Sequence, residues 1–453
     1  MAKKSGEEVN GNIFSTINKA FKTPDVRKRL WYTLLLIIIF RFGCYITVPG
    51  VDTFKLAETM DKSTTSLAGL IDTISGGAFS NLSIFAMSIT PYITSSIVIQ
   101  LLGMIIPSLE KLMKEGGEMS RTKVNRYTKI IAIILALVEA LGIYISYNSS
   151  GIFKNPGFLT GSVIVMSLIT GTSILIWLGE QITNKGVGNG ISMIIFVGII
   201  SRLPSAVVNL SQLVVKDSAI STVGIVTALV VILGAILLIA GVVFVQISER
   251  RVPVQYSKKV VGRKMYGGQN THIPLKLAMA GVMPIIFASS FMTFPAMMIQ
   301  IFASDKVGGT GFLAGLYNFS IATSSSNVGW GYSLANAIVY FVLIIGFTFF
   351  YTYATFNPDE VATQIKQNGG FVPGIRAGKP TAEYLKGTLN RITCVGAVFL
   401  SLIAILPMLL RFSDLNLSFG GTSILILVGV AIETVQQLES LIVMKHYKGF
   451  LEK

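Results

Sequence analysis

Few side chains in the apolar stretches of this 453-residue chain have the types needed for acid–base or metal chemistry. The ionisable ones are Arg41, Glu139 and Glu433, far apart in the sequence. An ion-coupled carrier normally keeps carboxylates or histidines near the middle of the membrane, and an intramembrane enzyme needs a nucleophile, a metal cluster or paired acids there. The chain also has no GxxxxGK[ST] phosphate loop and no HExxH or GxSxG motif. We therefore predict that the protein is not an enzyme, has no cofactor, and takes any energy from a partner.

The cysteines and histidines also give no sign of a metal site or a catalytic site. Cys44 and Cys394 both lie inside apolar stretches, where a free thiol usually acts as a small hydrophobic side chain. We assign them no disulfide and no metal. His272, one of two histidines, stands alone near the end of a loop and is expected at the surface.

Composition places the chain in a membrane. Fifty-two per cent of its residues are hydrophobic and only 13% are charged, which leaves too little polar surface for a water-soluble protein of this length. A hydrocarbon core about 30 Å thick needs roughly 20 apolar residues per helix. Segments of this kind predict ten transmembrane helices near 30–48, 74–106, 130–147, 161–179, 190–210, 222–247, 277–302, 333–355, 392–410 and 420–442.

Positive charge predicts the orientation of these helices. Most of the 37 Lys and Arg fall in the two tails and in alternate loops. Because such segments stay on the cytoplasmic side, we expect both termini in the cytoplasm, as an N-terminal segment 1–29 and a C-terminal tail 443–453.

The second predicted span is unusual for a helix. SGGAFSNLSIFAMSITPYI (75–93) has two glycines at its start and Pro91 inside it, so we predict a broken helix. Irregular backbone at membrane depth is tolerated where it is buried in protein or lines a watery cavity, which favours a segment facing a central pathway. A kinked helix without a special role is the alternative.

Isoleucines occur in pairs four residues apart on two predicted helices. They are Ile89 and Ile93 in ITPYI, and Ile191 and Ile195 in NGISMII. The members of each pair share one helix face. Packing and lipid contact are the common reasons for such pairs, and lining a pore is the other.

Two basic stretches, about 248–276 and 356–388, are long enough to project from the membrane into the cytoplasm. The first alternates cations with β-branched and aromatic residues, which predicts an extended hairpin with a basic face. Its cations would suit RNA phosphate or an acidic protein, although cytoplasmic Lys and Arg also serve topology and contact with anionic lipids. Their distance from the helix ends favours a partner. Arg376, in the turn-rich FVPGIRAG of the second stretch, is expected to be a presented contact.

Several motifs occur in a fixed order along nearly the whole chain: FRFGCYITVPGVD (40–52), SGGAFSNLSIFAMSITPYI (75–93), WLGEQITNKGVGNGIS (177–192), THIPLKLAMAGVMPIIFASS (271–290), FNPDEVA (356–362), FVPGIRAGKPTAEYL (371–385) and FGGTSILILVGVAIE (419–433). In these motifs and their order the chain resembles the bacterial SecY family.

The resemblance implies an all-α polytopic membrane protein of ten transmembrane helices around a central hourglass pore. The helices would form two pseudo-symmetric five-helix halves, 30–215 and 216–442. The implied function is a protein-conducting channel of the plasma membrane. It would move unfolded secretory polypeptides across the membrane and release hydrophobic segments sideways into the lipid.

The resemblance also implies a set of site residues. A plug, about 74–85, would include Ile74, Ser75, Gly76, Gly77, Ala78, Phe79, Ser80 and Asn81. A lateral gate would include Thr94, Gln100 and Phe294. The pore ring would be a gasket of aliphatic side chains that excludes water and ions yet stretches around a polypeptide. Its members would be Ile89, Ile93, Ile191, Ile195, Ile286 and Ile426.

The implied partners are the small membrane subunits SecE and SecG, the motor ATPase SecA, the ribosome with its RNA and proteins, signal peptides and unfolded precursors. The contacts for motor or ribosome carry over to Arg250, Arg251, Lys258, Lys259, Arg263, Lys264 and Arg376.

A secondary transporter of small solutes is the main alternative, because broken helices and inverted repeats occur there as well. The lack of charge near the middle of the membrane argues against it. A membrane-embedded enzyme would need a catalytic cluster that the sequence lacks, and a receptor without transport activity is opposed only by the resemblance.

Overall fold

The structure is a computed structural model that forms two compact units, described here one at a time. Unit 1 comprises Met1–Val207, Thr293–Asn327 and Val430–Lys453, and unit 2 comprises Val208–Met292 and Val328–Gly429. The residues that the structure describes are 20–56, 72, 75–114, 118–149, 151–154, 157–216, 219–220, 222–256, 259–261, 264–266, 270–303, 311–322, 329–411 and 421–451.

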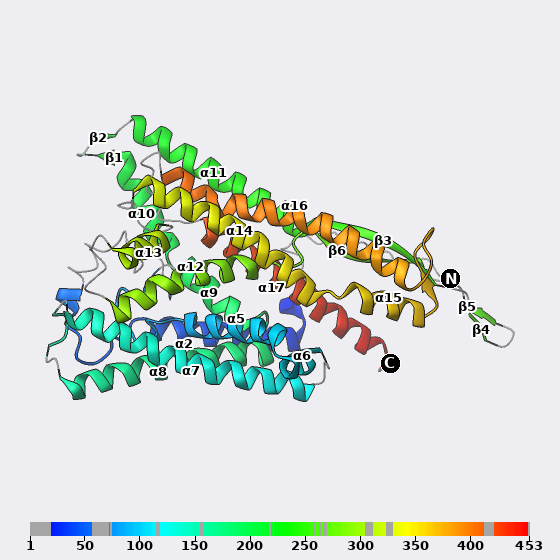
Figure 1. Ribbon diagram of the computed structural model, residues 1–453, viewed down its shortest axis with the longest axis horizontal. Coiled ribbons are helices and arrows are strands. Elements are labelled where there is room, and N and C mark those ends of the chain that lie inside the picture. Colours follow the sequence, from blue (N-terminus) through cyan, green and yellow to red (C-terminus); the bar gives the residue numbers. More distant parts are fainter. Residues whose placement is uncertain are drawn as a thin grey trace. The chain divides into compact units, whose positions relative to one another are not determined.

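Unit 1 is built from helices. Those wholly inside it are α2 (Pro24–Gly43), α5 (Thr90–Ile105), α6 (Pro107–Lys114), α7 (Glu118–Ser149), α8 (Phe158–Lys185), α9 (Gly190–Ile200) and α13 (Phe312–Ile321). Three further helices have residues in both units: α10 (Leu203–Val214), α12 (Met283–Phe302) and α17 (Gly421–Leu451). The long helices α7 and α8 lie side by side (Figure 1).

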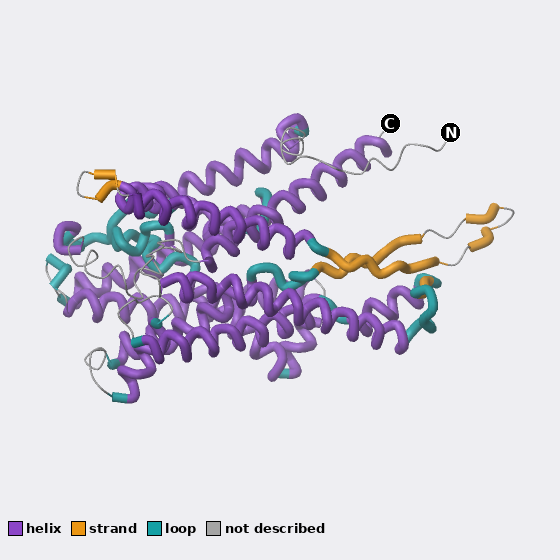
Figure 2. The backbone as a smooth tube through the Cα atoms, turned by 90° about the horizontal axis from the view of Figure 1, so that it is seen from above, coloured by secondary structure: helices purple, strands orange, loops and turns teal. Residues whose placement is uncertain are grey.

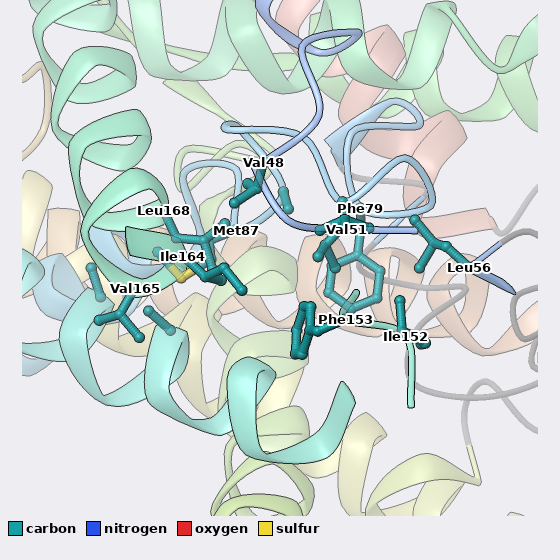
Figure 3. Packing of buried hydrophobic residues seen from close by; sticks show 14 residues of the cluster. Val48, Val51, Leu56, Phe79, Met87, Ile152, Phe153, Ile164, Val165 and Leu168 are labelled. Carbon is teal, nitrogen blue, oxygen red and sulfur yellow. The ribbon is translucent and has the colours of Figure 1, made fainter. Parts of the chain in front are cut away.

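Two apolar clusters hold the irregular segment 75–89 against the helices of unit 1. One contains Phe79, Val51 and Phe153, together with side chains of α8 (Figure 3). The other contains Ala78, Phe85 and residues of α2, α8 and α9. A fully buried Phe or Leu stabilises a fold by about 1.5–3 kcal/mol. The segment is therefore packed as a core element although its backbone is neither helix nor strand.

Unit 2 combines long helices with a small sheet. Its helices are α11 (Thr222–Ile247), α14 (Trp330–Thr355), α15 (Pro358–Gln367) and α16 (Lys379–Arg411), and its strands are β1 (Val215–Lys216), β2 (Ala219–Ile220), β3 (Glu249–Tyr256), β4 (Lys259–Val261), β5 (Lys264–Tyr266), β6 (Asn270–Lys276) and β7 (Gly370–Phe371). Helices α14 and α16 lie side by side (Figure 1). Strands β6, β3 and β7 form one sheet in that order.

The structure is mostly helical, as predicted. Among the described residues, six helices are long and apolar enough to cross a membrane, or seven if the bent pair α5 and α6 is one span; the six lie at Thr122–Asn148, Phe158–Lys185, Gly224–Ile247, Trp330–Gln367, Lys379–Leu406 and Ser423–Met444. Exposed apolar side chains cover these helices, as on α11, where Leu237 is 74% exposed. Such surface suits lipid. The count of ten spans stays a prediction.

The span predicted at 190–210 is wrong in one respect, because it is two helices. The chain turns at Ser201 and Arg202, between α9 and α10. Pro204 lies in the first turn of α10, where its missing N–H costs no helical hydrogen bond. A proline at this position starts a new helix, and the sequence analysis passed over it.

Candidate functional site

Ile89 and Ile93 lie where the irregular segment 75–89 meets α5. Ile89 is the N-cap residue and is fully buried, and the backbone N–H of Ile93 donates to its carbonyl over 3.0 Å. Pro91 is in the first turn of α5. The predicted break is therefore confirmed, and Pro91 marks where the helix starts rather than a kink within a longer helix.

Ile191 and Ile195 lie on α9, whose start is fixed by two local features. The side-chain oxygen of Asn189 accepts the N–H of Ile191 over 3.2 Å, which caps the helix. A Cβ atom on Gly190 would lie 1.8 Å from the Gly179 carbonyl oxygen of α8, so only glycine permits this approach. The close contact with α8 sets the position of Ile191.

Three of the six predicted ring isoleucines share one cluster. Ile89, Ile93 and Ile191 pack together with side chains from α2, α8 and the segment 75–89, and Ile195, one turn after Ile191, is 3% exposed. The buried members of this cluster besides Ile89 are Leu36, Phe40, Cys44, Ala78, Phe85, Leu175, Leu178, Ile182 and Ile194. The three isoleucines thus belong to one apolar cluster.

The other two ring candidates belong to unit 2. Ile286 lies in the first turn of α12 and Ile426 in the first turns of α17, and they are 9% and 7% exposed. Both side chains are thus almost fully buried. The complete six-residue ring stays a prediction.

The candidate plug residues are held on unit 1 by their side chains. Ser75 is buried, and its hydroxyl oxygen accepts the N–H of Phe79 over 3.1 Å. Phe79 itself is 5% exposed and lies beside Val51 (Figure 3). Gly77, Ser80 and Asn81 complete the same irregular stretch. Ile74 lies outside the described residues.

The three lateral-gate candidates all lie in unit 1. Thr94 donates to the Thr90 carbonyl over 3.1 Å and Gln100 donates to Ser96 over 3.2 Å, in both cases within α5. Phe294 on α12 is 41% exposed. These contacts do not show which partner helix each side chain faces, so the gate stays a prediction.

The two basic stretches fold into one structure, which we call the ribbon module: β3, β6, β7, α15 and the start of α16. Strands β3 and β6 form the predicted hairpin, an antiparallel ribbon with β4 and β5 beyond its end (Figure 2). Strand β7, from the second stretch, adds to β3 by pairing Gln255 with Phe371. One face of the ribbon packs on the helices in an apolar core of Val252, Val254, Leu275, Ile365, Val372, Leu385 and Leu389.

The described arginines of the ribbon module lie outside this core. Arg250, Arg251 and Arg376 are exposed, and Arg251 Nε lies 2.7 Å from a carboxylate oxygen of Glu249. Lys259 and Lys264 belong to β4 and β5. Lys258 and Arg263 lie outside the described residues. Arg250 and Arg251 thus stand on a packed sheet, whereas Arg376 lies in the turn between β7 and α16.

Three residues that contact the candidate plug were not among the predicted site residues. Asp72 forms an ion pair with Arg202, and the hydroxyl of Ser201 donates to the Gly76 carbonyl over 3.2 Å. One signal for them was available. Arg202 is a cation between two apolar helices, on the side of the membrane predicted to be poor in Lys and Arg.

Comparisons with known proteins agree over nearly the whole chain. The family profile of SecY matches residues 83–435. The protein translocase subunit SecY of Streptomyces scabiei is 41% identical over 454 residues, which cover 97% of this chain and 100% of that protein.

Two solved structures share the fold at 18% identity. One is described as "The plug domain of the SecY protein stablizes the closed state of the translocation channel and maintains a membrane seal", with a TM-score of 0.65 over 94% of this chain and 96% of that one. The other, "Sec61 in the Canine ribosome-channel complex from the endoplasmic reticulum", has a TM-score of 0.60 over the same shares. Motifs, fold, family profile and full-length relative all agree, and the chain belongs to the SecY family.

Proposed function

We propose that this chain is the channel subunit of a protein translocase, through which unfolded polypeptides cross the membrane and hydrophobic segments leave sideways into lipid. The observation that carries the proposal is the 41% identity, over 97% of the chain, to a protein named protein translocase subunit SecY. Such a channel needs no catalytic group of its own. A partner supplies the energy.

In this proposal the six isoleucines form the constriction of an hourglass pore between two halves, 30–215 and 216–442. The apolar cluster around Ile89, Ile93 and Ile191 supports it, because a narrow passage lined by aliphatic side chains excludes water and ions. Aliphatic side chains also change rotamer without losing hydrogen bonds. The ring therefore stretches around polypeptides of any sequence.

The segment of about 74–85 is proposed to be a plug that closes the pore, and Thr94, Gln100 and Phe294 to border a lateral gate. Support for the plug comes from its irregular, docked backbone and from the plug named for a similar structure. An apolar segment that meets lipid through the gate partitions out of the channel. Each buried CH₂ group contributes about 0.8 kcal/mol to that transfer.

The ribbon module is proposed to dock the ribosome or the SecA motor on the cytoplasmic side of the plasma membrane, where both termini also lie. The exposed Arg250, Arg251 and Arg376 support this role, as does the ribosome complex named for a similar structure. SecE and SecG are the proposed membrane partners, and anionic lipids the proposed contacts of the remaining cytoplasmic cations. The transporter alternative finds no support in the comparisons.

Reconstitution tests the proposal. The purified protein is placed in liposomes with SecE, and SecA, ATP and a secretory precursor are added. We expect precursor that is protected from protease only when ATP is present. No protection, with the protein folded and SecA bound, would reject the channel.

A further inference from the structure

A charged network ties the candidate plug to the end of α9. The Asp72 carboxylate pairs with the Arg202 guanidinium, and its Oδ1 accepts the backbone N–H of Ser80 over 2.7 Å. Arg202 Nη2 also lies 3.4 Å from the Ser80 hydroxyl. The side chain of Asp72 is 13% exposed and that of Arg202 is 32% exposed. Water therefore screens this ion pair less than a pair at the surface.

A second arginine holds the same stretch through its backbone. Arg41 Nη1, from the last turn of α2, donates to the Gly76 carbonyl over 2.9 Å. The hydroxyl of Ser201, next to Arg202, donates to the same oxygen over 3.2 Å. Arg41 of α2 and the turn of Ser201 and Arg202 after α9 thus converge on Asp72 and the residues 75–81, which we call the stretch.

Arg41 and Arg202 are close enough to repel each other. Two like charges side by side favour separation unless an anion or a dipole lies between them. Asp72 supplies an anion to Arg202, and the Gly76 carbonyl supplies a dipole to Arg41. The network is complete only while Asp72 and residues 75–81 are docked, because both acceptors belong to that stretch.

We propose that Asp72, Arg202 and Arg41 form an electrostatic latch that keeps this stretch docked, in which Asp72 neutralises Arg202 and Arg41 binds the Gly76 carbonyl. The inference rests on the proposed function, since docking of this stretch matters because it would close the pore. The latch explains how a plug can be held firmly and still be released. Breaking these charged contacts removes one restraint on the stretch, without any need to unfold a helix, and leaves the apolar packing of Ala78 and Phe79 as the other.

The test measures how quickly the stretch leaves its docked position. A single cysteine replaces the partly buried Asn81 in a protein that carries Cys44→Ala and Cys394→Ala, and a hydrophilic maleimide labels it in nanodiscs. Asp72→Asn and Arg202→Gln should each raise the labelling rate, by roughly tenfold for a coupling of ordinary size. The exchange Asp72→Arg with Arg202→Asp keeps the pair with its charges reversed, and should return labelling to the parent rate.

Lys129→Gln is the matched control, because it breaks another ion pair of unit 1, in which Lys129 Nζ lies 2.6 Å from Glu180 Oε1. It should label at the parent rate. The latch is rejected if the single variants label like the parent, if the exchanged pair labels as fast as they do, or if the control is equally fast. Failure of the proposed function looks different: the parent shows no ATP-dependent protection in liposomes, while the labelling differences persist.

Discussion

Both the backbone conformation and the lack of space around position 76 require a glycine there. Its φ is +66°, and a Cβ atom there would lie 2.7 Å from the Gly198 Cα atom and 2.8 Å from the Ser201 hydroxyl. The left-handed conformation alone costs alanine about 1–2 kcal/mol, and overpacking adds roughly 1–3 kcal/mol. We expect Gly76→Ala to displace the candidate plug and to speed labelling of a cysteine at position 81.

Gly151 offers the control for this substitution. Its φ is +67°, nearly the same as that of Gly76, but a Cβ atom there would meet nothing within 4 Å. Gly151→Ala should therefore lower the thermal midpoint slightly and leave labelling at position 81 unchanged. Equal labelling of the two variants would show that backbone strain, not packing against α9, governs position 76.

For single residues, the sequence predicted which side chains share one helix face. It did not predict which side chains from different elements are in contact. The four-residue spacing places Ile89 with Ile93 and Ile191 with Ile195, but nothing in the spacing brings the two pairs together; that expectation came from the resemblance. Arg202 was visible as an isolated cation, yet its partner Asp72 lies far away in the sequence. Long-range charge pairs depend on the fold, so single-sequence reasoning does not find them.

The ribbon module is the element whose packing is most readily tested. Leu385 on α16 is fully buried beneath the ribbon, while its neighbour Lys386 is exposed. Leu385→Ala should destabilise the module by about 2–5 kcal/mol through lost burial and a cavity. Amide hydrogen exchange should then quicken in β3 and β6 but not in α8, and Lys386→Ala should leave both unchanged. Unaltered exchange in β3 would mean that the ribbon does not depend on α16.

Arg376 is the residue that best tests the predicted contact with the motor or the ribosome. It is exposed in the turn between β7 and α16, and Thr381 donates to its carbonyl over 2.8 Å, which fixes the turn. Arg376→Glu should therefore leave the fold intact and strongly reduce motor-driven or ribosome-linked export, because the reversed charge repels an acidic or phosphate-bearing partner. Normal export by a stably inserted variant would remove Arg376 from the interface. Lys386→Glu controls for the change in net charge.

Elements defined by local pattern were predicted well, and elements defined by distant contacts were not. Alternation of cations with β-branched residues predicted the β3–β6 hairpin, which is observed. The pairing of β3 with β7 joins segments more than 100 residues apart, and no local pattern encodes it. The break between α9 and α10 was missed because apolar residues occur on both sides of it, although Arg202 and Pro204 mark its position.

For the whole molecule, the apolar composition of the sequence predicted that lipid surrounds the protein. It did not predict how the two units are arranged. The exposed leucines and valines of α11 follow from a span without a single charged residue, as expected for a helix in lipid. Composition says nothing of how two units combine around a pathway. The predicted pore ring is therefore where a test in the membrane adds most, because its six predicted members come from both units.

Ile286→Asn and Ile426→Asn test the ring directly. An amide side chain holds water where an aliphatic one excludes it, so the resting channel in a planar bilayer should conduct ions several times better than the parent, and export should accept weaker signal sequences. Ile285→Asn is the control, because Ile285 neighbours Ile286 on α12 and is fully buried, so it introduces the same amide at a non-ring position. Conductance that rises in all three variants would reflect loosened packing, and unchanged conductance and selection in both ring variants would remove the gasket. A rise confined to Ile286→Asn and Ile426→Asn would show that side chains from α12 and α17 close the same pathway.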